Sequence, residues 1–246
     1  MLRNAIAPDL LEILDTGSPG ETDFYSQYAR HCGGTVLVLM CGTGRVAIPI
    51  ARQGIPVIGL DGDAGTIELA KRKAAQAGAT RAMFIRGDAT HFVSDSKHPI
   101  VMIPGGGLLQ LLTIEEQRAC LNAIRSAMQV GAKLVLDVPL MEPGKADAVE
   151  PQLRKQGDRI ALVRRHRTYD GARQVASELI ECHWLDQDGT AIKSQYATTH
   201  TRYVTPGELM LLLESCGFSA TTFGGFDRRA LLPGSTRIVI EGERNR

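Results

Sequence analysis

The sequence lacks cysteines at the spacing of a metal or redox motif. No two of the five cysteines are separated by two residues, and no histidine pair stands near them at zinc-ligand spacing; they are Cys32, Cys41, Cys120, Cys182 and Cys216. We therefore expect no bound metal. An odd number of cysteines without paired spacing is typical of reduced, mostly buried thiols, which predicts a cytoplasmic protein.

Long apolar runs are also missing. The longest run falls far short of the roughly 20 residues that a membrane-spanning helix needs. The N-terminal segment MLRNAIAPDLLEILD has no apolar core followed by a cleavage site. The sequence therefore predicts neither a membrane partner nor a secretion signal.

The sequence has no excess of positive or negative residues. The chain has 28 basic and 27 acidic residues, and its net charge is +1. A nucleic-acid-binding protein shows clustered Lys and Arg and a high pI. The one basic run, residues 164–167, is short, and we interpret it as the exposed face and end of a strand. We expect a small molecule, and no nucleic acid, as the partner.

The length and composition are those of a globular protein. Hydrophobic residues make up 43% and charged residues 22% of the 246 residues. This length is long for one domain and short for two, so we expect a single domain over residues 1–246 that carries an insertion.

Short apolar segments alternate with helical patterns over residues 35–138, after two predicted helices at 8–16 and 21–32. The predicted strands are 36–40, 56–60, 82–86, 100–103 and 134–138, and the predicted helices are 45–53, 64–77 and 113–129. This alternation predicts parallel strands with helices on both faces of one sheet.

The pattern changes after residue 158. Residues 158–203 hold three strand-like stretches, which are separated by Asp170-Gly171 and Asp188-Gly189. Asp-Gly between such stretches is a strong hairpin signal, so we predict a three-stranded antiparallel insert. A helix from Thr205 to Gly217 follows, and strands near 218–223 and 236–241 form a closing hairpin.

Three signals follow the first three strands of the predicted sheet. Gly42 and Gly44 stand between a buried strand and a helix, where glycine lets a ligand approach the backbone. Asp61 ends the second strand, where a carboxylate can accept both hydroxyls of a ribose, and Asp88 follows the third. Ligands of open α/β sheets bind at this carboxyl edge, which predicts a nucleoside site.

These segments resemble a known family. Residues 41–47 (CGTGRVA), 59–61 (GLD) and 86–89 (RGDA) are similar to the motif series of class I S-adenosylmethionine-dependent methyltransferases. The similarity continues through residues 108–113, 130–138 and 202–209, and so covers the chain from about Asp23 to Ile240. It implies an α/β, Rossmann-like, seven-stranded and mostly parallel sheet with an antiparallel terminal hairpin.

The resemblance also implies an activity and a cofactor site. The chain would transfer a methyl group from S-adenosylmethionine to a small-molecule acceptor. Gly42 and Gly44 would approach the methionine part of the cofactor, Asp61 would bind its ribose, and Asp88 with Ala89 would bind its adenine. The predicted cofactor site also includes Tyr25, Cys41 and Gly62. Tyr25 would form a lid with Tyr28, or else both would simply pack their helix on the sheet.

The sequence departs from the family pattern in three places. Val38 stands where the first strand usually carries an acidic residue that helps hold the amino group of the cofactor. Met40 replaces a glycine or alanine, which crowds the end of that strand. Gly105, Gly106 and Gly107 replace polar or aromatic residues after the fourth strand, and they predict either open volume or a backbone nest for an anion.

The acceptor site is less defined. We expect the three glycines to form one wall of the acceptor pocket and the antiparallel insert to form the opposite wall; the alternative is that the insert forms the interface of a homodimer. His200 is the candidate general base and substrate contact. The alternative, which we prefer, is a half-buried strand histidine.

Two rival functions share part of this pattern. An NAD-dependent oxidoreductase would also use the glycine loop and Asp61, but it does not account for Asp88, the insert or the terminal hairpin. A cofactor-binding protein of the same fold, non-catalytic or repurposed for other chemistry, would be consistent with Val38 and the three glycines.

Overall fold

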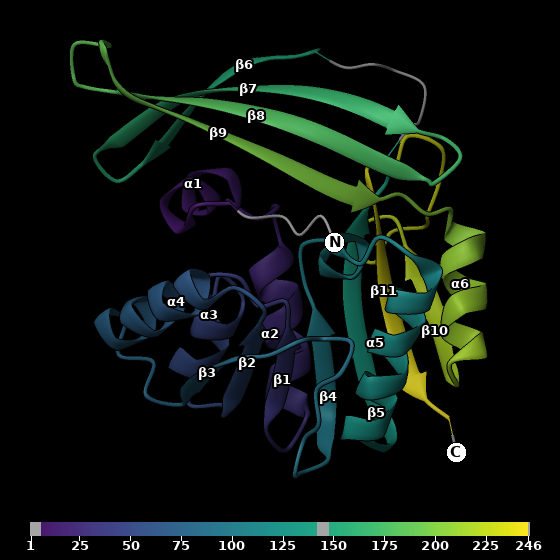
Figure 1. The fold of residues 1–246 in the computed structure, drawn as a ribbon. Helices are drawn as coiled ribbons and strands as arrows, with labels where there is room; N and C mark the ends of the chain where they lie inside the picture. The colour runs from purple at the N-terminus through teal and green to yellow at the C-terminus, as the bar shows by residue number, and fades with distance from the viewer. Residues whose placement is uncertain (1–5, 142–147, 246) are drawn as a thin grey trace. The chain divides into compact units, whose positions relative to one another are not determined.

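The chain folds into two compact units. The computed structural model describes residues 6–141 and 148–245 (Figure 1). The smaller unit comprises residues 1–16 and 142–203, and the larger unit comprises residues 17–141 and 204–246. All three predicted signals for the nucleoside site belong to the larger unit.

A seven-stranded sheet forms the centre of the larger unit. Its strand order is β10-β11-β5-β4-β1-β2-β3. The strands are β1 (Val36–Leu39), β2 (Val57–Asp61), β3 (Ala82–Arg86), β4 (His98–Ile103), β5 (Met128–Pro139), β10 (Phe218–Phe223) and β11 (Arg237–Arg244). Neighbouring strands from β3 to β5 pair in parallel, whereas β11 is antiparallel to both β5 and β10. The predicted mostly parallel sheet with an antiparallel terminal hairpin is confirmed.

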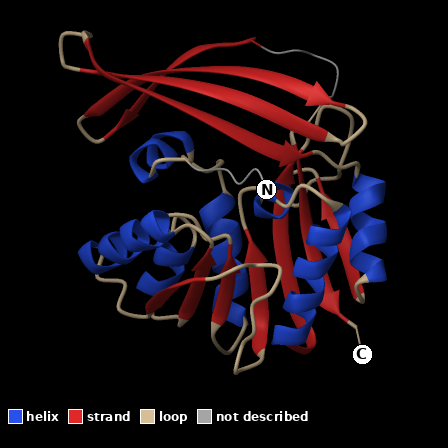
Figure 2. Ribbon diagram, viewed as in Figure 1, coloured by secondary structure: helices blue, strands red, loops and turns tan. Residues whose placement is uncertain are grey.

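Helices cover both faces of this sheet (Figure 2). Leu37 and Leu39 of β1 pack with α5 (Ile114–Ala127), α6 (Pro206–Ser215) and the short 3-10 helix η1 (Gly107–Gln110). Val36 and Val38 point to the other face, which is covered by α2 (Glu21–His31), α3 (Ala47–Arg52) and α4 (Ala64–Gln76). Successive residues of a strand face opposite sides, so a strand between two helical layers must be apolar throughout.

Side-chain caps set the beginnings of three helices. The Thr113 side chain accepts a hydrogen bond from the Glu116 backbone, and the Glu116 side chain accepts one from the Thr113 backbone, so the predicted capping box is present. Thr205 accepts a hydrogen bond from the Glu208 backbone at the start of α6, and Asp63 caps α4 in the same way. Each cap satisfies a backbone N–H that the helix leaves without a partner.

The smaller unit is an antiparallel sheet with one helix. Its strands lie in sequence order, β6 (Ala148–Gln156), β7 (Arg159–Asp170), β8 (Val175–Leu185) and β9 (Ala191–Arg202). The helix is α1 (Pro8–Leu14), whose Leu10 and Ile13 are buried against one face of the sheet. The predicted Asp170-Gly171 and Asp188-Gly189 turns do connect β7 to β8 and β8 to β9.

The three antiparallel strands predicted over 158–203 are confirmed as β7, β8 and β9, but the sheet also has a fourth strand, β6, which precedes that range and was not predicted. Pro151 and the charged residues of this segment hide the usual strand pattern. β6 is an edge strand, and the pairing register with β7 shifts between Val149 and Gln152, around the proline. An edge strand tolerates proline because one side of it makes no ladder hydrogen bonds.

Candidate functional site

The glycine loop follows β1 at the carboxyl edge of the larger sheet. Gly42 and Gly44 have φ angles of +55° and +87°, a backbone conformation that L side chains rarely adopt. A Cβ atom on Gly44 would lie 2.8 Å from Ile48 Cδ1 and 3.0 Å from Phe84 Cζ, so this glycine allows close packing. A Cβ atom on Gly42 would meet nothing within 4 Å. The open side of the loop is therefore at Gly42.

Asp61 ends the neighbouring strand β2 and joins this loop. Its Oδ2 accepts a hydrogen bond from the Gly42 backbone at 2.9 Å, and its Oδ1 accepts one from the Asp63 backbone at 3.0 Å. A carboxylate has about four acceptor positions, so each oxygen retains capacity for a hydroxyl. Burial raises the pKa of Asp61 above its ordinary value of 3.8, and the backbone N–H groups of Asp63, Gly42 and Gly62 oppose this effect.

Asp88, Ala89 and Gly62 lie along the same edge. The exposed Asp88 carboxylate follows β3, and its Oδ1 accepts hydrogen bonds from the backbone and hydroxyl of Thr90 at 2.9 and 2.7 Å. Ala89 is buried, whereas Gly62 is exposed and its carbonyl accepts a hydrogen bond from Arg86. The parallel strands β1, β2 and β3 therefore bring together the loop and both carboxylates, as the sequence predicted.

Cys41 and Tyr25 are both buried. Burial, followed by the nearby Asp61 carboxylate, raises the pKa of the Cys41 thiol well above its ordinary value, so this cysteine is not an activated thiolate. The Tyr25 ring packs against Phe24 and Phe226, and its hydroxyl donates to Asp137 Oδ1 at 2.7 Å. The packing interpretation of Tyr25 agrees with these contacts, and its role in cofactor binding stays a prediction.

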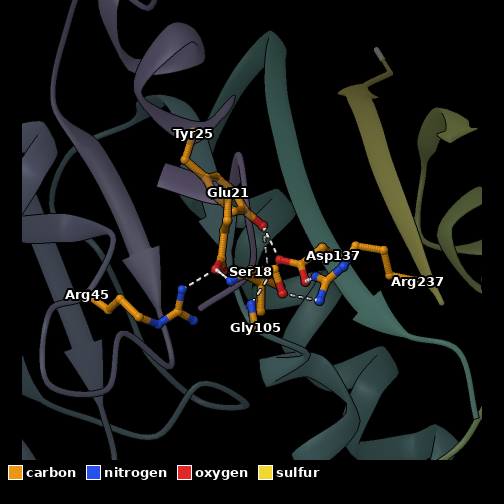
Figure 3. A network of polar contacts seen from close by, with 8 residues as sticks. Ser18, Glu21, Tyr25, Arg45, Gly105, Asp137 and Arg237 are labelled. Atoms are coloured by element: carbon orange, nitrogen blue, oxygen red, sulfur yellow. Dashed lines mark hydrogen bonds and ion pairs between the residues drawn. The ribbon is translucent and has the colours of Figure 1, made fainter. Parts of the chain in front are cut away.

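Asp137 on β5 organises a buried polar network (Figure 3). Its Oδ1 accepts hydrogen bonds from the Tyr25 hydroxyl and from the Gly105 backbone, the latter at 2.9 Å, and its Oδ2 binds Arg237. Arg237 also donates to the Ser18 hydroxyl at 2.6 Å. Burial and then the charge of Glu21 raise the pKa of Asp137, while Arg237 opposes this.

A second ion pair lies in the same network. The Glu21 carboxylate is 1% exposed, and its Oε2 accepts hydrogen bonds from Arg45 and from the Ser18 backbone. Arg45 directly follows Gly44 of the glycine loop. A Cβ atom on Gly105 would lie 2.8 Å from Arg45 Nη2. Arg45 therefore extends from the loop after β1 to the segment after β4.

The sequence did not indicate Glu21, Arg45 or Arg237 as functional residues. Glu21 and Arg45 are 24 positions apart, and Asp137 and Arg237 are 100 positions apart. No motif or periodicity connects such positions, because only the tertiary fold brings them together. The position of Arg45 after the glycine loop was the one local signal.

The three glycines after β4 do not form the predicted anion nest, whereas the predicted open volume beside them stays a prediction. Their backbone N–H groups donate to protein oxygens, namely Asp137 Oδ1, the Asp137 carbonyl and the Pro104 carbonyl. Arg45 lies beside Gly105, and Pro139 Cδ lies 2.8 Å from the Cβ position of Gly106. Their role as an acceptor wall stays a prediction.

Met40 adopts an unusual backbone conformation, with φ at +49°. Few residues other than glycine adopt a positive φ. Its Cβ atom lies 3.0 Å from the position that a Cβ on Gly107 would take. Met40 and Gly107 are therefore neighbours in the structure. Because Gly107 has no side chain, the space beside it is free for the side chain of Met40.

His200 lies on β9 of the smaller unit. Its side chain is half-buried, and its Nδ1 is 2.9 Å from the Ser177 hydroxyl. This is the half-buried strand histidine that we preferred as the interpretation. Its role as a general base stays a prediction.

Within residues 6–141 and 148–245, no group of three or more His, Cys, Asp or Glu side chains has a geometry that could hold a metal ion. None of the helices in these residues is long and apolar enough to cross a membrane.

The comparison with solved structures decides the fold. The methyltransferase CcbJ from Streptomyces caelestis superimposes with a TM-score of 0.78 at 21% identity, covering 94% of this chain and 92% of its own. DesVI from Streptomyces venezuelae has a TM-score of 0.78 at 15% identity, covering 98% and 99%. This chain has the class I methyltransferase fold.

Sequence comparison gives shorter matches to methyltransferases. A family described as "Methyltransferase domain" matches residues 36–131, which hold the glycine loop, Asp61 and Asp88. The 23S rRNA (uracil(1939)-C(5))-methyltransferase RlmD of Stenotrophomonas maltophilia is 35% identical over 77 residues. That match covers 31% of this chain and 15% of the relative, so it concerns a small part of the rRNA enzyme.

Proposed function

We propose that this chain transfers the methyl group of S-adenosylmethionine to a small-molecule acceptor. The observation that carries the proposal is the junction of Asp61 with Gly42. A half-buried carboxylate with spare acceptor positions is bound to the side of the glycine loop where a Cβ would meet nothing. Two vicinal hydroxyls of a ribose fit such an acceptor, and the open loop admits the chain that continues from the ribose.

The roles of the chain's own residues follow from this placement. When bound, S-adenosylmethionine would supply an electrophilic methyl group for the lone pair of the acceptor, with S-adenosylhomocysteine as the leaving group. Asp61 and the Gly42 loop hold the nucleoside and fix its orientation. Alignment of the acceptor with the methyl group is then the main contribution of the protein. A general base is needed only when the acceptor arrives protonated.

Several observations support a small acceptor rather than RNA. KedS8 from a Streptoalloteichus species is described as a sugar N-methyltransferase, and it has a TM-score of 0.77 while covering 100% of this chain and 95% of its own. The match to rRNA enzymes covers only part of this chain. In addition, Arg165 and Arg167 of the basic run pair with Glu178, so part of its charge is neutralised. Amino sugars are therefore the first acceptors to test.

The second candidate function is a cofactor-binding protein that does not transfer methyl groups. Val38 favours this candidate, because it replaces the expected carboxylate and is fully buried in the apolar core. Under this alternative the chain would bind the cofactor and leave its methyl group in place.

A methyl-transfer assay separates the two candidates. The protein is incubated with S-adenosylmethionine carrying a labelled methyl group and a panel of amino sugars and other small amines, and products are identified by mass. We expect one product heavier by a labelled methyl group, and we expect Asp61→Ala to abolish or strongly reduce it. Binding of the cofactor without any methylated product across the panel would favour the second candidate.

A further inference from the structure

The strand order places a switch point between β1 and β4. From β1 the chain continues outward through β2 to β3, and it then returns to β4 on the other side of β1. Ligands of open α/β sheets bind at such a point, where the loops after the two strands diverge. Here these loops carry Arg45 after β1 and Gly105 after β4, and the two residues are in contact. Arg45 therefore bridges the switch point.

The end of β1 supplies no charge to this point. Val38 is 0% exposed and packs in the apolar layer with α2 and α3. An ammonium group at the switch point needs a carboxylate from elsewhere in the chain, since an unpaired charge in a dry site is strongly unfavourable. The network of Figure 3 contains two carboxylates, Asp137 and Glu21.

Both oxygens of Asp137 already have donors. Its Oδ1 accepts from Tyr25 and from the Gly105 backbone, and its Oδ2 pairs with Arg237. The charge of Asp137 is therefore already paired within the chain.

Glu21 differs from Asp137 because one of its oxygens is not engaged. Its Oε2 accepts from Arg45 and Ser18, whereas its Oε1 is buried and has no hydrogen-bond partner within residues 6–141 and 148–245. A buried carboxylate oxygen without a donor is unfavourable, so its presence points to a donor that arrives with a ligand.

Two glycines shape a cradle around the pair of Glu21 and Arg45. A Cβ atom on Gly17 would lie 2.6 Å from Arg45 Nη1 and 2.8 Å from Glu21 Oε2. A Cβ atom on Gly105, on the other side, would lie 2.8 Å from Arg45 Nη2. Side chains at either position would therefore displace the ion pair, so both glycines are needed for this arrangement.

We infer that Glu21, held by Arg45, is the carboxylate that binds the ammonium group of the cofactor's methionine part. The position of the acidic group has thus moved from the end of β1 to the first residue of α2. This inference rests on the proposed function and adds a specificity-determining residue to it. A ligand with the ammonium group would bind more tightly than the same ligand without it.

The test compares two ligands on the intact protein by calorimetry. One ligand is S-adenosylhomocysteine, and the other is its analogue in which hydrogen replaces the amino group. The variants are Glu21→Gln and, as the matched control, Glu68→Gln on α4, where the exposed Glu68 carboxylate pairs with Lys71 at 2.8 Å. The ratio of the two affinities reports on the amino group alone, because a general loss of stability affects both ligands.

We expect the wild type and Glu68→Gln to bind S-adenosylhomocysteine at least tenfold more tightly than the analogue, since a hydrogen bond between charged groups has about that effect. In Glu21→Gln the ratio should fall close to one. A ratio that stays high in Glu21→Gln, or a wild-type ratio near one, would overturn the inference while leaving the proposed function intact.

Two other outcomes of the experiment also decide the inference. If Glu21→Gln does not fold, Glu21→Asp keeps the charge beside Arg45 but shortens its reach, and the ratio should still fall; an unchanged ratio there would also overturn the inference. If the wild type binds neither ligand, the proposed function fails, and the inference fails with it.

Discussion

At the residue scale, Met40 and Gly107 form a coupled pair. Met40 has a positive φ angle, and its Cβ atom occupies space beside the position that a Gly107 side chain would take. Two departures from the family pattern that look independent in the sequence are therefore one packing arrangement. The consequence is that neither position can be changed freely without the other.

Gly107→Ala tests this coupling. Its new methyl group would lie 3.0 Å from Met40 Cβ and 3.0 Å from Ile103 Cγ2, so we expect the free energy of unfolding to fall by about 1–3 kcal/mol. In a Met40→Gly background the loss should be smaller, because one of the two close contacts is gone. Urea unfolding of the four proteins gives the coupling energy, and additivity within about 0.5 kcal/mol would contradict the pairing.

Val38 offers a second prediction. Its side chain is 0% exposed, so Val38→Glu would bury a carboxylate without a partner and should lower the free energy of unfolding by several kcal/mol. The matched control is Val38→Gln, which has nearly the same shape and no charge. Thermal unfolding should show Val38→Glu as the less stable variant at neutral pH, with the difference shrinking on acidification. Equal stability of the two variants would mean that the position accommodates a charge.

Asp61 leads to a pH prediction. Burial raises the pKa of this carboxyl above 3.8, so Asp61 takes up a proton at a higher pH than an ordinary aspartate. Its deprotonated form accepts the ribose hydroxyls, so affinity for S-adenosylhomocysteine should fall as the pH falls through this raised pKa. Calorimetry at a series of pH values tests this, with Asp61→Asn as the control whose affinity should be low and less dependent on pH. A wild-type affinity that is constant down to pH 3.8 would contradict the assignment.

At the element scale, helix caps make measurable contributions. Thr113 and Glu116 exchange hydrogen bonds at the start of α5, and the helix buries its apolar face against the sheet. Thr113→Ala should lower the free energy of unfolding by about 1 kcal/mol, because a backbone N–H loses its partner. Thr113→Ser keeps the hydroxyl and should retain most of that stability in urea unfolding. If both variants lose the same amount, the hydroxyl is not the stabilising group.

Local signals account for the elements that the sequence predicted correctly. The apolar segment Val36–Leu39 predicts a strand that is buried on both faces. In the structure, helices do cover both faces of this strand, β1. The Asp-Gly dipeptides predict the turns of the smaller unit because they favour tight hairpins. The strand β6 was not predictable, because Pro151 and charged residues remove the alternation that marks a strand.

The residues of the candidate site also fall into those that local sequence signals predicted and those that they did not. Asp61, Asp88 and the Gly42 loop were predictable, since parallel strands end at one edge of a sheet whatever their distance in sequence. The contacts of Gly105–Gly107 were not predictable, because three glycines in a row do not reveal which side chains from other parts of the chain pack against them. Glu21 and Arg45 meet only through the packing of α2 against the glycine loop, which no local pattern encodes.

At the scale of the whole molecule, similarity of fold extends much further than similarity of sequence. The methyltransferase family matches residues 36–131, whereas CcbJ superimposes on 94% of the chain at 21% identity. Across such a distance the fold is retained although about four residues in five differ from those of CcbJ. Val38, Met40 and the three glycines are the positions where the sequence departs from the pattern of the family it resembles.

The central claim is that the junction of Gly42 and Asp61 binds the nucleoside of S-adenosylmethionine. Titration calorimetry of the intact protein with S-adenosylhomocysteine tests it most directly. We predict binding at a single site, and we predict that Asp61→Ala weakens it tenfold or more, because charged hydrogen bonds to the ribose contribute about 1.5–3 kcal/mol. Absence of binding to the wild type, or equal affinity in Asp61→Ala, would contradict the account.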